Sequence, residues 1–336
     1  MIVNSTNLHL QEAIEIFYSF NEDLVLNSLS PTYVWLDSFR NSELIPTYWF
    51  ANHKDYKYLH CFHITNNRKY NISDIESSYG YGGPISNTEN QEFLQAVSEE
   101  FEFWANKKNI IAEFIRFHPL IQNHCWYTGK ISKNRKTIFI DLTKDLYAEY
   151  ESRRVTDIKR GLERLSFEKV DSNLMLEIFP NLYTENMIDV KASKFYFFCK
   201  KYIENLISNS ITDNWIIKFK EQVVSATIII KSEISKTLEY HLSASNILGR
   251  KNKASSFMIH IIANYYKKEG YSTLYLGGGR TEEENDSLLF FKKGFSKNIK
   301  DFYIGHKIFN SEKYSEIKLL NKKTFNKNKI LFYKED

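Results

Sequence analysis

The sequence predicts a mixed α/β protein made of two successive domains. Each half of the 336-residue chain runs in the same order, with an antiparallel meander, a loop, a helix and a strand. Residues 79–117 of the first half parallel residues 240–276 of the second. A polar, basic stretch at 129–135 has no apolar periodicity and separates the halves. We therefore predict one domain over residues 1–130 and another over residues 131–336, each with a mixed central sheet.

The composition indicates a globular chain, because 43% of the residues are hydrophobic and 26% are charged. No apolar run approaches the roughly 18 residues that a membrane-spanning helix needs. The N-terminus has no basic region, and Glu12 and Glu15 interrupt its apolar pattern, which excludes a signal peptide and predicts a cytoplasmic protein. The net charge of +4 is mild and gives no indication of DNA binding.

The cysteines and histidines do not form a recognisable metal or disulfide pattern. Cys61, Cys125 and Cys199 are odd in number and far apart, which argues against a disulfide framework and against zinc. His60 and His63 fall in one predicted strand with no third ligand at useful spacing. We expect no metal.

Secondary-structure elements of the first half follow from apolar spacing and turn residues. A helix is expected at residues 7–20, an antiparallel meander at 48–73 and a strand at 111–117. Between them, Tyr79-Gly80-Tyr81-Gly82-Gly83-Pro84 forms a loop, and Thr88 and Gln91 stand at the spacing of a capping box before a helix.

The second half contains a strand at residues 137–142 and an amphipathic helix from Lys144 to Leu165, with Leu162 inward and Arg153 and Arg154 outward. A mostly helical region covers residues 173–208. The meander follows, then a helix that Gly270 ends, and a further strand. Their expected ranges are 214–219, 223–231 and 237–245 for the meander, 252–269 for the helix and 271–276 for the strand.

The most specific string begins where the strand at 271–276 ends in three glycines, Gly277, Gly278 and Gly279. An acidic run at 282–284 comes next, then Asp286 and a short apolar helix that closes with Lys292, Lys293 and Gly294. This string resembles the C-terminal signature of the FemABX-like branch of the acetyltransferase superfamily. The glycine-rich loop at 79–84 and the strand before His118-Pro119 also resemble the first FemABX domain. The resemblance implies two tandem acyl-CoA N-acyltransferase (GNAT)-like domains and the transfer of acyl or aminoacyl groups.

The resemblance also implies a donor site. In acetyltransferase-type folds, the loop before the helix at 252–269 offers backbone N–H groups to the pyrophosphate of the donor. We expect this site to bind acyl-CoA, such as acetyl-CoA, although the usual Arg/Gln-x-x-Gly-x-Gly/Ala spacing is not present and leaves the donor open. The expected donor-binding residues are Gly249, Arg250, Asn252, Lys253, Ala254 and Ser255.

Three residues are candidates for catalysis. His241 is a candidate general base because an unperturbed histidine titrates near neutral pH. Lys292 is a candidate for stabilising an oxyanion or holding an acceptor phosphate, and Tyr303 for donating a proton to the leaving group. Strand alternation places His241 with Glu239 and Ser243, on the face opposite Tyr240. The expected substrate-binding residues are Tyr81, Gly82, Gly83, Tyr240, Gly277, Gly278, Gly279 and Asp286.

Three functions stay open at this point. The first, which we favour, is acyl-CoA-dependent formation of an amide on an amino sugar, carried on a nucleotide, for a cell-envelope polysaccharide. The second is aminoacyl transfer from tRNA to a lipid-linked or peptidoglycan precursor, although residues 171–214 show no sustained heptads for a long tRNA-binding arm and the run at 282–284 is acidic. The third is a binding protein without catalysis. Acceptor and oligomeric state stay open as well.

Overall fold

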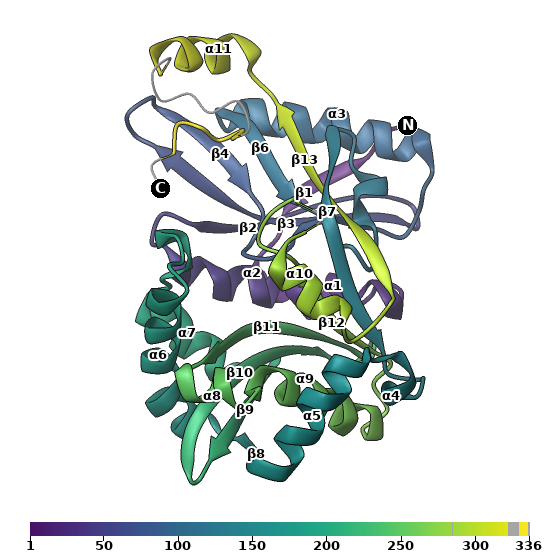
Figure 1. Ribbon diagram of the computed structural model, residues 1–336. Helices are drawn as coiled ribbons and strands as arrows, with labels where there is room; N and C mark the ends of the chain where they lie inside the picture. The colour runs from purple at the N-terminus through teal and green to yellow at the C-terminus, as the bar shows by residue number, and fades with distance from the viewer. Residues whose placement is uncertain (284, 322–328, 335–336) are drawn as a thin grey trace. The chain divides into compact units, whose positions relative to one another are not determined.

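The computed structural model describes residues 1–283, 285–321 and 329–334, so that Glu284 of the acidic run lies outside the described residues. The chain divides into two compact units (Figure 1). Unit 1 consists of residues 1–134 and 302–336, and unit 2 of residues 135–301. The sequence-based division gave residues 131–336 to the second domain. The structure differs at the C-terminus, because the last strand pairs with a strand of unit 1 and returns the chain to it.

The sheet of unit 1 has the strand order β1-β2-β3-β4-β6-β13, with β5 paired to β3. The pairs β2–β3 and β3–β4 are antiparallel, which confirms the predicted meander, whereas β4 and β6 are parallel. The last strand, β13, runs antiparallel to β6, with Ile304 opposite Arg116. The strands are β1 (Asn4–Asn7), β2 (Ile45–His53), β3 (Tyr56–Asn67), β4 (Ile72–Glu76), β5 (Gly83–Ser86), β6 (Ile110–Arg116) and β13 (Ile299–Ile308).

Helices cover both faces of this sheet. Phe62 of β3 packs against Phe101 of α3, with ring centroids 5.9 Å apart, whereas the next residue, His63, hydrogen-bonds through Nε2 to the Val34 carbonyl of α2 at 2.8 Å. Because successive strand residues point to opposite faces, α2 and α3 lie on opposite sides. The helices are α1 (Leu10–Phe17), α2 (Pro31–Asp37), α3 (Gln91–Lys107) and α11 (Ser311–Leu320).

The predicted N-cap of α3 was wrong by two residues. Asn90 caps the helix, and its side-chain oxygen accepts a hydrogen bond from the Phe93 amide at 2.9 Å. Asparagine is at least as good an N-cap as threonine, so the nearer residue takes the position expected for Thr88.

The sheet of unit 2 has the order β7-β12-β11-β10-β9-β8. The pairs β9–β10 and β10–β11 are antiparallel and confirm the second predicted meander, whereas β11 and β12 are parallel. The strands are β7 (Lys130–Asp141), β8 (Leu165–Val170), β9 (Thr212–Phe219), β10 (Gln222–Ser232), β11 (Thr237–Ser245) and β12 (Thr273–Gly278). The helices are α4 (Leu146–Glu149), α5 (Ser152–Arg164), α6 (Ser172–Asp189), α7 (Lys200–Ile207), α8 (Ile247–Lys251), α9 (Ala254–Lys268) and α10 (Ser287–Lys293).

The single helix predicted from Lys144 to Leu165 is wrong, because the buried Tyr150 has an extended backbone and separates α4 from α5. The inward face also differs. Arg154 is buried and donates to the Ser256 hydroxyl at 3.0 Å, whereas Leu162 is 55% exposed. The cause is the approach of α5 to α9, where a Cβ on Gly161 would lie 2.8 Å from Phe257, so that the face through Arg154 and Gly161 is the one that packs.

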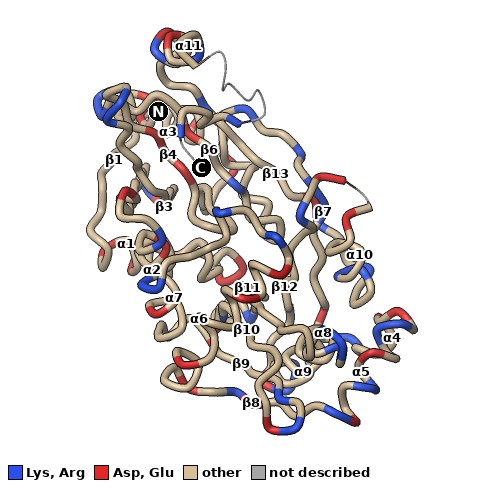
Figure 2. The backbone as a smooth tube through the Cα atoms, turned by 60° about the vertical axis from the view of Figure 1, so that its left-hand side comes forward, with Lys and Arg blue, Asp and Glu red and all other residues tan. Residues whose placement is uncertain are grey.

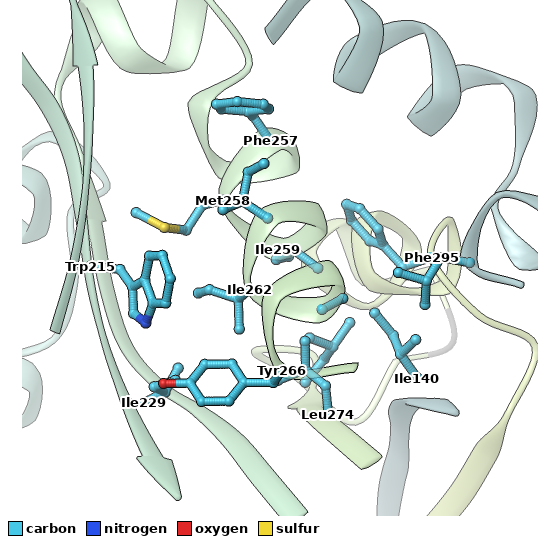
Figure 3. Packing of buried hydrophobic residues seen from close by; sticks show 14 of the residues in the cluster. Ile140, Trp215, Ile229, Phe257, Met258, Ile259, Ile262, Tyr266, Leu274 and Phe295 are labelled. Atoms are coloured by element: carbon cyan, nitrogen blue, oxygen red, sulfur yellow. The ribbon is translucent and has the colours of Figure 1, made fainter. Parts of the chain in front are cut away.

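Helix α9 fills the core of unit 2 (Figure 3). Phe257, Met258 and Ile262 belong to the same buried cluster as Trp215 of β9 and Ile229 of β10. The preceding strand residue, Asn214, points to the other face and donates to the Ile207 carbonyl at the end of α7. Helices α9 and α7 therefore cover opposite faces of this sheet. Gly270, with φ of +79°, follows α9 as the sequence predicted.

We predict that Phe257→Ala lowers the free energy of unfolding by about 3–5 kcal/mol, because it leaves a cavity in the cluster around α9. Urea unfolding followed by circular dichroism measures the change. Phe103→Ala is the matched control, since Phe103 is 66% exposed and its loss should change stability by less than about 0.5 kcal/mol. Equal effects of the two substitutions would contradict the assignment of the core.

Candidate active site

The parallel strands β11 and β12 are paired over a short stretch only. Their register runs from Thr237 opposite Thr273 to Glu239 opposite Tyr275, and the described residues contain no β11–β12 pair beyond it. After that point β11 continues to Ser245 along β10, and β12 continues along β7. Helix α9 connects the two strands. The carboxyl ends of parallel strands joined by a helix are a common place for ligands in α/β sheets, so this separation marks the candidate site.

A β-bulge shapes β11 beyond the separation. Ile229 pairs with Tyr240 and Ile228 with Leu242, so that His241 is the inserted residue of the bulge. The predicted alternation is therefore wrong here, and the hydroxyls of Tyr240 and Ser243 lie 2.8 Å apart. His241 Nε2 instead lies 3.3 Å from the hydroxyl of Tyr202, a buried residue of α7. Bulges often re-aim side chains beside active sites.

Six hydroxyl groups line the α9 side of this part of the sheet, and we call them the hydroxyl row. Thr227 lies 3.1 Å from the Tyr240 hydroxyl, and Ser245 lies 2.8 Å from Ser225 and 3.2 Å from Ser255 at the start of α9. Sequence reasoning missed most of the row, although Ser or Thr at alternate positions, 225 and 227 of β10 and 243 and 245 of β11, was a signal. The hydroxyl row consists of Ser225, Thr227, Tyr240, Ser243, Ser245 and Ser255.

Burial raises the pKa of Tyr240, and the hydrogen bonds with Ser243 and Thr227 only partly oppose this effect. The phenol therefore stays protonated at neutral pH and can act as a hydrogen-bond donor.

Asp286 closes the loop between β12 and α10. One carboxylate oxygen accepts hydrogen bonds from the amides of Leu288 and Leu289, each at 2.9 Å, and caps α10. The other accepts the amides of Arg280 and Thr281 at 2.9 and 3.0 Å. Burial by itself would raise the pKa of Asp286, but these four donors together lower it below its usual value. The geometry gives Asp286 a loop-forming role; its contact with substrate stays a prediction.

Backbone conformation at Gly277, and contacts within the chain at Gly278 and Gly279, explain the three glycines. Gly277 has φ of +76°, a conformation that other residues rarely adopt. A Cβ on Gly278 would lie 3.0 Å from the Lys136 carbonyl, and a Cβ on Gly279 would lie 2.4 Å from Asp286 Oδ1. The groups that approach this strand end belong to β7 and to Asp286, and contact of the glycines with substrate stays a prediction.

Lys292 of α10 is brought back to the end of β12. Its ammonium group donates to the Gly278 carbonyl at 2.7 Å, and the side chain is half-buried. Burial lowers the pKa of Lys292 to about 8, against the opposing effect of the Asp286 carboxylate and with a contribution from the Arg135 guanidinium. Arg135 is itself bonded to the Gly279 carbonyl at 2.9 Å. Lysines with lowered pKa values are candidates for functional groups, since both protonation states are populated near neutral pH.

The residues expected to bind an acyl-CoA pyrophosphate make mainly internal contacts. Arg250 forms a 2.6 Å ion pair with Asp189 and also donates to the Ser245 carbonyl. Gly249 lies against β10, where a Cβ would come 2.3 Å from the Val224 carbonyl oxygen.

The remaining four lie where the chain enters α9. Lys253 has φ of +63°, Ala254 is fully buried, Asn252 donates to the Leu248 carbonyl, and Ser255 belongs to the hydroxyl row. The positive charge expected from Arg250 is thus largely neutralised within the protein.

A pocket of about 420 Å³ opens beside these residues. It lies between the end of α6 and the start of α8. Its lining is formed by Glu185, Ile188, Asp189, Asn246, Ile247 and Leu248.

Four candidate residues lie in unit 1. Tyr81 packs edge to face on His118 with ring centroids 4.7 Å apart, and the Gly82 amide donates to the Arg116 carbonyl at 2.7 Å. Gly83 has φ of +95°. Tyr303 stacks on His124, with centroids 4.1 Å apart. Their roles in binding or catalysis stay predictions.

Two kinds of feature are absent from the described part of the chain. No group of three or more His, Cys, Asp or Glu side chains there is placed to hold a metal ion. None of its helices combines the length and the apolar character that crossing a membrane requires.

The two units define a mixed α/β fold of tandem acyl-CoA N-acyltransferase (GNAT)-like type, and solved structures confirm this assignment. FemX is similar over 94% of this chain and 99% of its own, with a TM-score of 0.70 and 14% identity. The C-terminal domain of a putative lysylphosphatidylglycerol synthetase from Agrobacterium fabrum is similar over 94% of this chain and 96% of its own, with a TM-score of 0.61 and 14% identity. A tandem GNAT protein from the clavulanic acid biosynthesis pathway is similar over 92% of this chain and 99% of its own, with a TM-score of 0.54 and 8% identity.

No protein-family model and no curated protein matches the chain. At these identities the likeness to solved structures establishes the fold, which is FemABX-like as the sequence predicted.

We predict that the half-buried ammonium group of Lys292 makes stability depend on pH. Its pKa is about 8 in the folded chain and about 10.4 in an unfolded chain, so that between these values the unfolded state binds more protons. The free energy of unfolding should therefore rise with pH across this interval. Lys292→Met should remove the rise, whereas Lys293→Met, one position along α10, should keep it. Urea unfolding at a series of pH values measures both, and a rise that survives in Lys292→Met would refute the assignment.

Proposed function

We propose that the chain is an acyltransferase that forms an amide on an amino group of a cell-envelope precursor. The observation that carries the proposal is Lys292, a half-buried lysine with a pKa of about 8 that is held at the carboxyl end of β12. The FemX-like fold supports the reaction class by analogy. The name lysylphosphatidylglycerol synthetase, carried by another structure of this fold, supports an envelope acceptor in the same way.

The reaction needs a group that handles one proton. The acceptor amine attacks the carbonyl carbon of an activated ester or thioester, a C–N bond forms, and the bond between the acyl carbon and the donor breaks. The amine nitrogen loses a proton, and the departing oxygen or sulfur gains one. Neutral Lys292 can take the proton, and charged Lys292 can stabilise the oxyanion; at a pKa of about 8 both forms are present. The protonated Tyr240 and the rest of the hydroxyl row would hold the donor through hydrogen bonds.

Two donors are candidates. The N-terminus of α9 and the similarity to a tandem GNAT protein support acyl-CoA as the donor. Against it, Arg250 forms an ion pair with Asp189, and Gly249 packs against β10. These contacts weaken the pyrophosphate site that the sequence led us to expect. They favour the second donor, an aminoacyl-tRNA, whose ester does not require a pyrophosphate-binding loop. A binding protein without catalysis is the outcome if neither donor reacts.

We predict that Lys292→Ala lowers the transfer rate about a hundredfold, on the scale of losing one oxyanion-stabilising donor, while the chain stays folded. The assay follows transfer of a radiolabelled acetyl group from acetyl-CoA, and of labelled amino acids from charged tRNA, to lipid-linked and nucleotide-linked amino-sugar precursors. Lys293→Ala is the control and should keep the wild-type rate.

The outcomes separate the hypotheses. Transfer from charged tRNA alone would establish an aminoacyltransferase, and transfer from acetyl-CoA alone an acetyltransferase. Wild-type turnover in Lys292→Ala with either donor would place the active site elsewhere. Binding of a precursor without any transfer would support the non-catalytic hypothesis.

A further inference from the structure

The segment Val190–Lys201, which joins α6 to α7 and includes the first two residues of α7, combines aromatic and basic residues in an unusual way. Its sequence contains four consecutive aromatic residues at 195–198 and no Asp or Glu. A short 3₁₀ turn, Lys194–Tyr196, lies in its centre. Its lysines are Lys191, Lys194, Lys200 and Lys201, and all four are exposed.

Three of the four aromatic side chains are on the surface. Phe195 is 48% exposed, Tyr196 40% and Phe197 43%, and Ile188 in the last turn of α6 is 62% exposed. Single exposed apolar residues are ordinary, but a run of three aromatic residues in one surface turn is not. Exposed apolar groups gathered in this way mark an interaction surface.

Contacts with buried aromatic residues of α6 fix the backbone of the turn. Phe198 stacks on Tyr183 with centroids 6.0 Å apart, and Tyr183 stacks on Phe179 at 5.4 Å. The Tyr183 hydroxyl donates to the backbone carbonyl of Tyr196 at 3.0 Å. Because Phe179 and Tyr183 are buried in the unit, the backbone of the turn is fixed while the side chains at 195–197 stay exposed.

The charge around the aromatic turn is positive. The acidic residues that flank the segment in the sequence form ion pairs: Asp189 pairs with Arg250 at 2.6 Å, and Glu204 lies 3.5 Å from Lys200, which leaves Lys191 and Lys194 as excess positive charge. Exposed aromatic side chains flanked by lysines are the composition that binds the interface of a bilayer, where rings enter the headgroup region and lysines meet anionic lipids. Phe195 and Tyr196 meet edge to face at 85°, which suits filling an apolar layer better than a flat platform for stacked bases.

We propose that Val190–Lys201 docks unit 2 on an anionic lipid surface. Phe195, Tyr196 and Phe197 enter the boundary between headgroups and acyl chains, and the four lysines contact the negative headgroups. The binding is reversible and weakens with salt, because the electrostatic part acts within a Debye length. The surface is a property of the fold and does not depend on the reaction proposed above.

Co-sedimentation with vesicles tests the proposal. The wild type should bind vesicles of phosphatidylcholine with phosphatidylglycerol and bind pure phosphatidylcholine at least about tenfold more weakly. The triple variant Phe195→Ser, Tyr196→Ser, Phe197→Ser should lose at least about tenfold in partitioning to the anionic vesicles. It keeps the contact of Tyr183, which uses only the backbone of residue 196. The double variant Phe103→Ser, Phe167→Ser removes two other exposed rings and should bind as the wild type does.

Cys199 gives a second measurement that does not depend on the triple variant. It is exposed within the segment, and in a Cys125→Ser background the other cysteine, Cys61, is buried. A polarity-sensitive dye on Cys199 should shift to the blue when anionic vesicles are added. No shift, or unchanged vesicle binding of the triple variant, overturns the proposal. Binding of tRNA that the triple variant loses, without any vesicle binding by the wild type, would overturn it in favour of an RNA surface.

Discussion

The parallel pairing of β11 with β12, and its end after three residue pairs, is the constraint on which the site in unit 2 depends. Beyond Glu239 and Tyr275, β12 stays with β7 and β11 stays with β10. The connection between the parallel strands crosses over through a helix, and α9 fills this role with Phe257, Met258 and Ile262 in the core of the unit. The burial of α9 therefore fixes its N-terminus next to Ser245, where the hydroxyl row lies.

At the end of β12, local electrostatics decide the state of Lys292. Gly277, Gly278 and Gly279 let the chain turn tightly enough for Asp286 to collect four backbone amides. Because that carboxylate accepts hydrogen bonds from the loop, it forms no close ion pair with Lys292. Burial is therefore the main influence on the pKa of this lysine. An arrangement that only stabilised the fold would place a compensating acid beside a buried lysine. Here the ammonium group donates to the Gly278 carbonyl, and Asp286 acts on it only as a neighbouring charge.

Local pattern predicted much of this architecture. The strand at 237–245 has the predicted ends, and the helix at 254–268 lies within the predicted range, since a clear period and a terminal glycine set them. What failed depended on distant partners. Neither the return of β13 to β6 nor the burial of Arg154 against Ser256 leaves a trace in the neighbouring sequence. The bulge at His241 and the pairing of Arg250 with Asp189, 61 positions earlier, are of the same kind. The glycines and Lys292 were selected because their spacing is local, and their roles in the site stay predictions.

The most direct measurement is the titration of Lys292 itself, by competitive acetylation with acetic anhydride over a range of pH and mass spectrometry of the peptide that contains it. We expect an inflection near pH 8 for this one lysine. We also expect a bound donor or acceptor to protect Lys292 from the reagent. An inflection near the ordinary lysine value of about 10.4, with no protection by either substrate, would contradict the claim that the end of β12 is the active site.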